Sequence, residues 1–471
     1  MTTALLIDFG STYTKLRAID LERRSVLGAG QGPSTVASDI TIGMKAALAD
    51  LERRLGALPK FKYRLASSSA AGGLRMITIG LVRELTAEAA RQAALGAGAR
   101  LVGSFAYRLT AADLQTITTL APDIVLLAGG TDGGNSDVIL HNARALATSS
   151  ISCPIVYAGN RAAADETGML LAAKTVIVTE NVMPEFNVLN IEPARAAIRK
   201  VFIDRIVHAK GIDRASAEFD QVLMPTPAAV MEGARLIADG CTSASGLGEL
   251  LVVDPGGATT DVHSIANGAP ATPGVIPHGL PEPRVKRSVE GDLGMRHNAA
   301  TIVEAAGLDA VARESQLQPR RVTALVDRYT HDVERLPGNS DELALDQALA
   351  RAAVRIAVAR HCGSVETVYT VNGAVTVQQG KDLSALKTVI GTGGALAHSR
   401  DPHAVLRMAC ADPAAPLLLR PRAPRLLVDR DYLLYACGLL GAVEPEAALE
   451  LALKHLLPVG EKPPRERTFS A

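Results

Sequence analysis

The sequence has few of the features that mark zinc-binding, iron–sulfur, disulfide-rich or polyanion-binding proteins. Its five cysteines lie far apart and form no C-x-x-C pair, which disfavours a zinc knuckle, an iron–sulfur ligand set and a disulfide scaffold. We expect them to be reduced thiols of the core. Lysine plus arginine and aspartate plus glutamate both total 49, so the formal net charge is zero. A chain without net charge has no general attraction for nucleic acid or an anionic membrane.

Long apolar segments are absent as well. No apolar run approaches the ~18 residues of a membrane span, and the first residues lack the basic flank and apolar stretch of a secretory signal. We therefore expect a cytoplasmic protein with neither a membrane nor a nucleic-acid partner. At roughly 100–200 residues per domain, the 471 residues are enough for about two to four domains with ample core.

Two common nucleotide-binding patterns are also missing, but another device occurs twice. The sequence contains no G-x-x-x-x-G-K-[ST] and no strand-linked G-x-G-x-x-G, which argues against a P-loop or a dinucleotide-binding fold. Instead, "ALLIDFGSTYTKLRAID" (4–20) and "GELLVVDPGGATTDVHSI" (248–265) each contain an apolar strand, an aspartate, a turn of small residues and a second strand. The apolar residues on both sides of each turn predict two β-hairpins.

The two hairpin turns have the chemistry of a phosphate site. Their small residues, at Gly10–Thr12 and Gly256–Thr259, leave backbone N–H groups able to face an anion, so two such turns facing each other would cradle a polyphosphate. Asp8 and Asp254, at the strand ends, would hold the waters of a Mg²⁺ ion, which prefers one or two carboxylates plus phosphate oxygens. Lys15, on the returning strand, is placed to reach the β- or γ-phosphate as a point charge.

Three further motifs extend this pattern along the chain. "GTGG" (391–394) is a third glycine turn after a strand, and "PTPAAVMEGARL" (225–236) and "DYLLYACGLLGA" (431–442) are helical segments rich in small residues. In this order the five motifs resemble phosphate-1, connect-1, phosphate-2, adenosine and connect-2 of the actin, heat-shock-chaperone and sugar-kinase ATPase superfamily. The resemblance implies an α/β fold, a two-lobed actin-like ATPase with duplicated ribonuclease-H-like lobes, which binds Mg-ATP in the cleft between its lobes.

The resemblance also implies roles for individual residues. Asp8 and Asp254 would orient Mg²⁺ waters, and Asp261 or a water held by Asp254 would be the base that aligns the attacking water. Gly393 and Gly394 would let the backbone pass close to the α-phosphate or the ribose. The candidate catalytic residues are thus Asp8, Asp254 and Asp261, and the candidate metal ligands are Asp8 and Asp254. The candidate nucleotide-binding residues are Gly10, Ser11, Thr12, Lys15, Gly256, Gly257, Ala258, Thr259, Gly391, Gly393 and Gly394.

After the first hairpin, the pattern changes to regular α/β alternation. Five apolar strand segments separated by helical segments between Arg75 and Val207 predict a doubly wound parallel sheet, which we interpret as an inserted domain. The expected domains are lobe I at 1–72 and 216–248, the insert at 73–215, lobe II at 249–458 with a helical subdomain at about 280–362, and a disordered tail at 459–471.

Two stretches have more than one interpretation. "AGGTDGGN" (128–135) follows a strand of the insert, where doubly wound sheets place ligand sites, but it also suits a glycine-rich turn capped by Asp132. In "RVKRSVEGDLGMRHN" (284–298), the basic residues could steer an acidic partner. For this second stretch we favour a solvated loop followed by the start of a helix.

Several stretches are similar to one family of this superfamily. "LLIDFGSTYTKLRAID", "DIVLLAGGTDGGN", "VYAGN", "VKRSVEGDLGMRHNA" and "VIGTGGALAH" resemble the glutamate mutase (methylaspartate mutase) accessory proteins, the MutL/GlmL family, and the similarity extends from about residue 4 to residue 455. It implies an ATP-dependent chaperone, with slow Mg-dependent ATPase activity, that reactivates an adenosylcobalamin-dependent mutase. The implied partners are the mutase subunits and ATP or ADP. A small-metabolite kinase and an actin-like filament protein remain alternatives on the same fold, although no second acidic motif stands where a kinase would need its base.

Overall fold

A computed structural model of the chain describes residues 2–10, 13–35, 39–68, 74–209, 220–371 and 373–459. The fold divides into two compact units. Unit 1 comprises Met1–Gly233, Gly279–Pro283 and Tyr435–Ala448, and unit 2 comprises Ala234–His278, Arg284–Leu434 and Leu449–Ala471. The domain boundaries expected from the sequence remain predictions, and the expected tail lies outside the described residues except for its first residue, Val459.

The first sheet of unit 1 is built around the N-terminal hairpin. Strand β1 (Thr3–Phe9) pairs antiparallel with β2 (Tyr13–Asp20) and parallel with β4 (Tyr63–Ser68). With β3 (Ser25–Pro33) and β10 (Gln221–Pro225), the strands lie in the order β10-β4-β1-β2-β3. Every residue of β1 is buried, which explains its nearly continuous apolar run.

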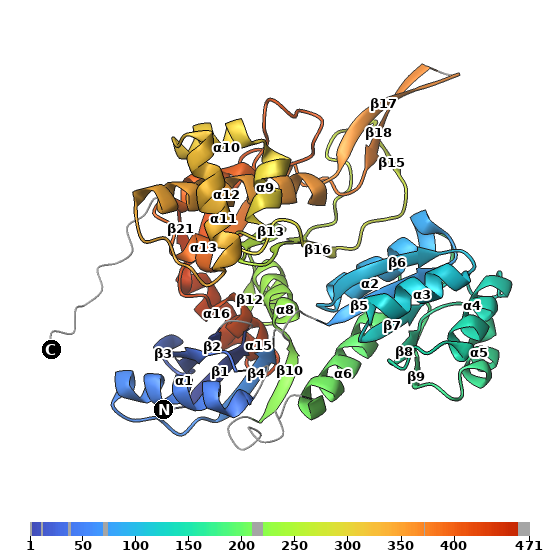
Figure 1. The fold of residues 1–471 in the computed structure, drawn as a ribbon, viewed down its shortest axis with the longest axis horizontal. Helices are drawn as coiled ribbons and strands as arrows, with labels where there is room; N and C mark the ends of the chain where they lie inside the picture. Colours follow the sequence, from blue (N-terminus) through green and yellow to red (C-terminus); the bar gives the residue numbers. More distant parts are fainter. Residues whose placement is uncertain are drawn as a thin grey trace. The chain divides into compact units, whose positions relative to one another are not determined.

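Helix α1 (Ile40–Leu55) packs on the backbone of β3, as Figure 1 shows. Gly30 and Gly32 lie where this helix approaches, and neither position has room for a side chain. A Cβ at Gly32 would lie 2.5 Å from the carbonyl oxygen of Gly43 in the helix. The glycine-rich strand is therefore required by the close contact between helix and sheet.

The insert of unit 1 is a second sheet of five strands, all parallel, in the order β6-β5-β7-β8-β9. Its strands are β5 (Arg75–Gly80), β6 (Arg100–Ala106), β7 (Ile124–Leu127), β8 (Ile155–Tyr157) and β9 (Val176–Val178). Its helices are η1 (Arg83–Ala87), α2 (Glu88–Gly96), α3 (Ala111–Leu120), α4 (Asp137–Thr148), η2 (Arg161–Ala163), α5 (Ala164–Leu170) and α6 (Glu192–Ala209). Alternate strand residues pack into two cores, one with α2 and α6 and the other with α3, α4 and α5. The predicted doubly wound sheet is confirmed.

The two helices predicted from small residues are α8 (Thr226–Asp239) and α15 (Leu434–Leu440), and α16 (Pro445–His455) follows the second. Within unit 1, a Cβ added at Gly438 of α15 would overlap with the carbonyl oxygen of Ala229 in α8. The two helices therefore meet backbone to backbone at this point, which only a glycine at 438 allows.

Unit 2 contains a sheet with the same topology as the first. Strand β13 (Leu250–Pro255) pairs antiparallel with β14 (Thr260–Ile265) and parallel with β19 (Thr388–Gly391), as β1 does with β2 and β4. The order is β16-β14-β13-β19-β20-β21. The added strands are β16 (Val285–Glu290), β20 (Arg425–Asp429) and β21 (Leu456–Pro458). The duplicated topology and the insert confirm the predicted α/β fold class, an actin-like ATPase fold with two ribonuclease-H-like lobes.

The remaining elements of unit 2 are helices and small sheets. The helices are α9 (Ala299–Ala306), α10 (Leu308–Ser315), α11 (Pro319–His331), α12 (Ser340–His361), α13 (Gly394–Ala397), α14 (Pro402–Leu406) and η3 (Arg407–Ala409). One sheet has the order β15-β18-β17 and contains β15 (Ile276–His278), β17 (Ser364–Thr370) and β18 (Gly373–Gln379), and a second pairs β11 (Gly240–Cys241) with β12 (Ala244–Ser245). Strands β17 and β18 pair antiparallel, and Asn372 between them lies outside the described residues.

One expected element differs from the structure. The sequence favours a solvated loop and helix start at 284–298, but Val285–Glu290 is strand β16 at the edge of the sheet, so this interpretation is wrong for its first part. Arg287, in the middle of the strand, is buried against Asp261. A buried arginine that pairs with a carboxylate looks like a surface residue in a sequence, which concealed the strand.

Two expectations from composition can be compared with the structure. All five cysteines are free thiols, and Cys153, Cys362 and Cys437 are buried. Cys241 and Cys410 are partly exposed, so the expectation that all five belong to the core is wrong for these two. Among the described residues, none of the helices combines the length and the apolar character that crossing a membrane requires.

Candidate functional site

The first hairpin carries a deeply buried carboxylate. Asp8 lies opposite Lys15 in the β1–β2 register, and 2% of its surface is exposed. Its Oδ1 accepts hydrogen bonds from the hydroxyl of Thr226 at 2.6 Å and from the hydroxyl of Ser67 at 3.4 Å. Burial raises the pKa of the Asp8 carboxyl, against the opposing influence of the Lys15 charge and the two hydroxyl donors. A buried carboxylate of this kind gains from a cation placed beside it.

A backbone hydrogen bond closes the turn of this hairpin. The N–H of Gly10 donates to the carbonyl oxygen of Tyr13 at 3.0 Å, and a Cβ at Gly10 would lie 2.6 Å from that same oxygen. Glycine is thus required at the start of the turn. Ser11 and Thr12, both candidate nucleotide-binding residues, lie outside the described residues.

In the turn of the second hairpin, the backbone carbonyl groups accept hydrogen bonds from another segment of the chain. Asp254 lies opposite Asp261, and the N–H of Gly256 donates to Thr259 O at 2.8 Å. The carbonyl oxygen of Gly256 accepts from the N–H of Met295 at 3.0 Å. The carbonyl oxygen of Gly257 accepts from the next two N–H groups, those of residues 296 and 297, at 2.9 and 3.0 Å.

These hydrogen bonds hold the carbonyl side of the turn and leave its N–H side open. Within the described part of the chain, the N–H groups of Gly257 and Ala258 have no hydrogen-bond acceptor, and both residues are exposed. Gly294 makes the support possible, since a Cβ there would overlap with the backbone of Ala258. The segment 291–298 is therefore a buttress of the turn, and it leaves two adjacent donors to face an anion.

Asp261, the second carboxylate of this hairpin, is held by an arginine. Nη2 and Nε of Arg287 both donate to Asp261 Oδ2, at 2.6 and 3.1 Å, and both side chains are largely buried. The hydroxyl of Thr259 donates to Oδ1 at 3.2 Å. Next to this ion pair, burial and the positive charge of Arg287 lower the pKa of His263 to about 4, so this histidine is neutral at pH 7.

The "GTGG" turn lies directly against Asp254. Strand β19 pairs with β13 so that Gly391 is opposite Val253, and the N–H of Thr392 donates to Val253 O at 3.0 Å. Gly393 has φ +86°, and a Cβ added there would overlap with Asp254 Oδ1. The structure thus brings the third glycine turn and the second aspartate together, as the order of the motifs implies. At this position glycine is required both by its backbone angle and by the close carboxylate.

Sequence reasoning missed one carboxylate of this region. Asp429, at the end of β20, accepts the N–H groups of Leu433 and Leu434 at 2.8 and 2.9 Å and the hydroxyl of Thr392 at 2.9 Å. Burial raises the pKa of the Asp429 carboxyl, and these hydrogen bonds oppose the effect. Through these hydrogen bonds Asp429 connects the "GTGG" turn to the start of α15. The available signal was "RLLVD" (425–429), an apolar strand that ends in aspartate, as β1 and β13 nearly do.

The structure gathers the candidate residues separately in each unit. Asp8, Gly10 and Lys15 lie together in unit 1, and Asp254, Asp261 and the two glycine turns lie together in unit 2. In the described ranges no three His, Cys, Asp or Glu side chains gather as a metal site. A Mg²⁺ ion held mainly by waters and phosphate oxygens does not require such a cluster.

The "AGGTDGGN" turn of the insert is occupied by its own contacts. Asp132 Oδ1 accepts the N–H of Arg161 at 2.9 Å and the side-chain amide of Asn181 at 3.0 Å, and Asn160 Oδ1 accepts the N–H of Gly133 at 3.0 Å. These bonds join the turns that follow β7, β8 and β9. They favour the interpretation of a capped glycine turn over that of a ligand site.

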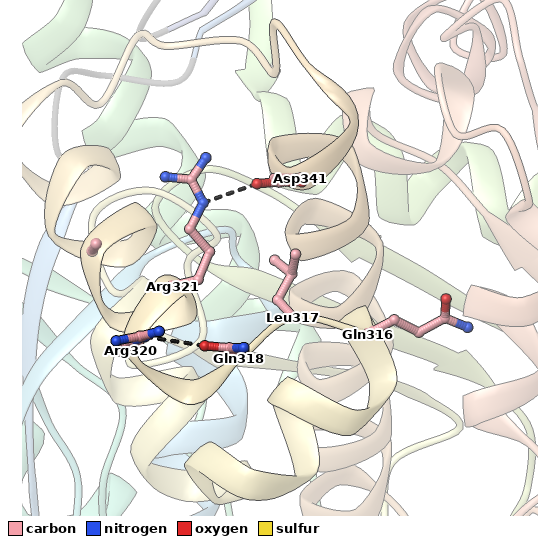
Figure 2. Close-up of a pocket in the computed structure, with 7 residues that line it drawn as sticks. Gln316, Leu317, Gln318, Arg320, Arg321 and Asp341 are labelled. Atoms are coloured by element: carbon pink, nitrogen blue, oxygen red, sulfur yellow. Dashed lines mark hydrogen bonds and ion pairs between the residues drawn. The ribbon is translucent and has the colours of Figure 1, made fainter.

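A pocket of about 520 Å³ lies elsewhere in unit 2, between α10, α11 and the start of α12. Figure 2 shows two contacts among its polar side chains. Arg321 Nε lies 2.9 Å from Asp341 Oδ2, and Arg320 Nε donates to Gln318 Oε1 at 3.0 Å. None of the candidate nucleotide-binding residues lines it.

Comparison with known proteins gives one strong likeness. The family model described as "MutL protein" matches residues 4–456. Protein MutL of Clostridium tetanomorphum is 45% identical over 462 residues, which cover 98% of this chain and 100% of that protein.

Solved structures are more distant. An activator of 2-hydroxyisocaproyl-CoA dehydratase from Clostridium difficile, with bound ADPNP, is 9% identical with a TM-score of 0.34, over 98% of this chain and 100% of that one. Xylulose kinase from Bifidobacterium adolescentis is 12% identical with a TM-score of 0.32, over 98% of this chain and 95% of that one. These likenesses are too remote to bear on activity.

Proposed function

Because the chain belongs to the MutL protein family, we propose that it is an ATP-binding accessory protein that reactivates an adenosylcobalamin-dependent mutase such as glutamate (methylaspartate) mutase. The resemblance of its motifs to the glutamate mutase accessory proteins supports this class of client. ATP would act as the switch between states that bind and release the client. The free energy available from such a switch is limited to the difference in the client's affinity for the two nucleotide states.

The observation that carries the nucleotide site is the open turn of the second hairpin. The carbonyl groups of Gly256 and Gly257 are engaged by the buttress at 291–298, whereas the N–H groups of Gly257 and Ala258 have no acceptor in the described ranges. Adjacent backbone donors without acceptors suit the oxygens of a phosphate group. The equivalent turn of unit 1, with Gly10 and Lys15, is proposed to hold phosphate oxygens in the same way.

The two aspartates that precede these turns are proposed to orient the waters of Mg²⁺. Asp8 suits this role because it is buried and burial raises the pKa of its carboxyl, so a cation beside it would favour the ionised form. Asp254 suits it because its Oδ1 lies against Gly393, which fixes the carboxylate beside the glycine turn. When bound, the ion would neutralise phosphate charge and align the terminal phosphoryl group for hydrolysis. Gly393 and Gly394 would let the backbone approach the α-phosphate or the ribose.

Two candidates were left open for the group that aligns the attacking water. Arg287 donates twice to Asp261 Oδ2, so that oxygen is occupied by a positive partner and is a poor acceptor for a further proton. We therefore favour a water held by Asp254, and we assign Asp261 to positioning the strand and its turn. Slow hydrolysis would agree with the lack of a strong base.

A pair of variants at one residue tests the phosphate site. Gly257→Pro removes one N–H donor, because proline has no backbone N–H. Gly257→Ala keeps the donor, and its added Cβ would lie 3.9 Å from Arg296, an ordinary contact. One hydrogen bond to a charged group contributes about 1.5–3 kcal/mol, so Gly257→Pro should weaken Mg-ATP binding roughly tenfold to a hundredfold.

Isothermal titration of the full chain with Mg-ATP and Mg-ADP measures this effect. We expect binding in the micromolar to millimolar range, near-normal affinity for Gly257→Ala and the loss in Gly257→Pro. No binding by the unaltered chain would refute the nucleotide site, and equal affinities of the two variants would refute the role of the turn. ATP turnover that depends on an added small metabolite would favour the kinase alternative.

A further inference from the structure

The carboxylate of Asp8 is held through one of its two oxygens. Oδ1 accepts the hydroxyl of Thr226 at 2.6 Å and that of Ser67 at 3.4 Å, whereas Oδ2 accepts no hydrogen bond from the residues that the structure describes. Oδ2 lies on the side of Gly10, where an added Cβ would be 3.7 Å from it. The two oxygens therefore have different surroundings, and only Oδ2 faces the turn that is proposed to hold phosphate.

Thr226 is the stronger of the two donors. Its distance of 2.6 Å from Oδ1 is that of a hydrogen bond to an ionised oxygen, about 2.5–2.7 Å, whereas 3.4 Å exceeds the usual limit of about 3.0 Å. The Ser67 hydroxyl also lies 3.4 Å from the carbonyl oxygen of Ile7 and 3.3 Å from the Thr226 hydroxyl. Its single proton thus has several acceptors at similar distances, and Thr226 supplies most of the support.

The fold places Thr226 beside the carboxylate from a distant part of the chain. Strand β4 lies between β1 and β10, and the register aligns the aspartate with Ser67 and with Met224 of β10. Thr226 follows two residues later, where β10 ends and α8 begins (Figure 1). Pro225 and Pro227 flank it, and each proline fixes its own φ. A β-branched side chain on this restricted backbone has few rotamers to lose when its hydroxyl binds.

We propose that Thr226 is a positioning residue of the metal site. Its hydroxyl holds Oδ1 of Asp8, which directs Oδ2 toward the turn at Gly10, where that oxygen would orient a water of Mg²⁺. This inference rests on the proposed function and assigns separate tasks to the two carboxylate oxygens. The terminal torsion of an aspartate is broad and roughly twofold, so the carboxylate needs a fixed donor to keep one orientation. Mg²⁺ demands nearly ideal octahedral geometry and is sensitive to that orientation.

A purely structural role for the hydroxyl leads to a different result. If Thr226 only compensated the buried charge of Asp8, its loss would lower the stability of the nucleotide-free protein and leave the effect of Mg²⁺ on ATP binding unchanged. The discriminating quantity is the metal ratio, defined as the Kd for ATP in EDTA divided by the Kd for ATP in Mg²⁺. Residues that orient a metal ligand typically change metal affinity by about tenfold to a hundredfold.

Three variants separate these roles. Thr226→Val removes the hydroxyl and keeps the branched shape, and Thr226→Ser keeps the hydroxyl. Thr14→Val is the matched control, because Thr14 is also a buried threonine of unit 1 and its hydroxyl has no hydrogen-bond partner among the described residues. Thermal unfolding of each full-length variant establishes that it is folded. Thr226→Ala takes the place of Thr226→Val if the latter does not unfold cooperatively.

Isothermal titration of the full chain with ATP, in EDTA and in Mg²⁺, measures the metal ratio. We expect Thr226→Val to lower the ratio by about tenfold or more, with an affinity in EDTA close to that of the unaltered chain. Thr226→Ser and Thr14→Val should keep the ratio of the unaltered chain within about threefold.

Several results would overturn the positioning role and leave the nucleotide site intact. They are an unchanged ratio in Thr226→Val, an equal loss of its affinity in EDTA and in Mg²⁺, and an equal fall of the ratio in Thr226→Ser or in Thr14→Val. Failure of both Thr226→Val and Thr226→Ala to fold would show that the fold itself requires the hydroxyl, which also overturns a role specific to the metal. No ATP binding by the unaltered chain, or ATP binding that Mg²⁺ does not strengthen, would overturn the proposed Mg-ATP site together with this inference.

Discussion

Asp8→Asn should stabilise the nucleotide-free protein while weakening its binding of Mg-ATP. Asparagine has the same shape and keeps an oxygen that can accept from Thr226 and Ser67, so the variant removes the negative charge and replaces the second oxygen by an amide group. Lys15 is half-buried and can remain hydrated when the carboxylate is gone. The variant thus separates the cost of a buried charge from the loss of its packing.

The size and pH dependence of the effect follow from the raised pKa of Asp8. Below about pH 4, near the ordinary pKa of an aspartate, the carboxyl is protonated in both the folded and the unfolded chain, and the two proteins should be equally stable. As the pH rises through the raised pKa, the folded protein must ionise a buried group and loses stability. Lys15 and the two hydroxyls offset part of a penalty that is otherwise several kcal/mol, so we expect a gain of about 1–3 kcal/mol for Asp8→Asn at pH 8. For unfolding of the whole chain, at about 2.1 cal/mol/K of entropy per residue, that gain corresponds to a midpoint higher by roughly 1–3 °C.

Thermal unfolding between pH 4 and pH 8, with and without Mg-ATP, measures both parts of the prediction. At a ligand concentration of 100 times Kd the unaltered protein should gain about 2.7 kcal/mol, and the variant should gain less. A midpoint for nucleotide-free Asp8→Asn that is at or below that of the unaltered protein at pH 8 would show that the charge of Asp8 is already compensated. The argument that the Asp8 carboxylate gains from a bound cation would then be refuted.

Two further predictions concern unit 2. Gly393→Ala should lower the free energy of unfolding by about 1–3 kcal/mol because of its positive φ, and its Cβ would also overlap with Asp254. Gly394→Ala, with open space at its Cβ, should leave the free energy of unfolding unchanged. A urea titration of both variants measures this, and equal losses of stability in the two would contradict the described geometry of the turn. The N–H of Gly338, with nearby arginines, lowers the pKa of the buried Glu342. The ionised carboxylate therefore stabilises the fold at pH values above the ordinary pKa of glutamate, and this stabilisation is lost as the pH falls through the lowered pKa. Glu342→Gln should cost about 2 kcal/mol at pH 7 and much less at pH 4, and a loss independent of pH would argue against the charge.

Local patterns in the sequence were sufficient to predict the elements that repeat. Both hairpins were predictable because apolar strands flank an aspartate and small turn residues, and the insert was predictable because its strands and helices alternate regularly. The fold class was implied by the resemblance of these motifs, in this order, to those of the actin-like ATPase superfamily. Strand β16 was not predicted, because Lys286 and Arg287 interrupt its apolar alternation and only the contact of Arg287 with Asp261 explains their place.

The partners of the site residues depend on long-range contacts that no local pattern contains. Thr226, whose hydroxyl donates to Asp8, lies 218 residues from that aspartate in the chain. Asp429 was missed because only its bonds to Thr392 and the start of α15 distinguish it from any aspartate at the end of a strand. The roles of Ser11 and Thr12 remain predictions.

Recovery of an inactivated mutase tests the central claim most directly. Glutamate mutase that has been inactivated by turnover or by cyanocobalamin is incubated with this protein and fresh adenosylcobalamin, with Mg-ATP, with Mg-ADP or without nucleotide. Mutase activity should return with Mg-ATP and the unaltered protein, and it should not return with Asp254→Ala or without nucleotide. Equal recovery in all of these samples, or no recovery in any of them, would contradict an ATP-dependent reactivating function.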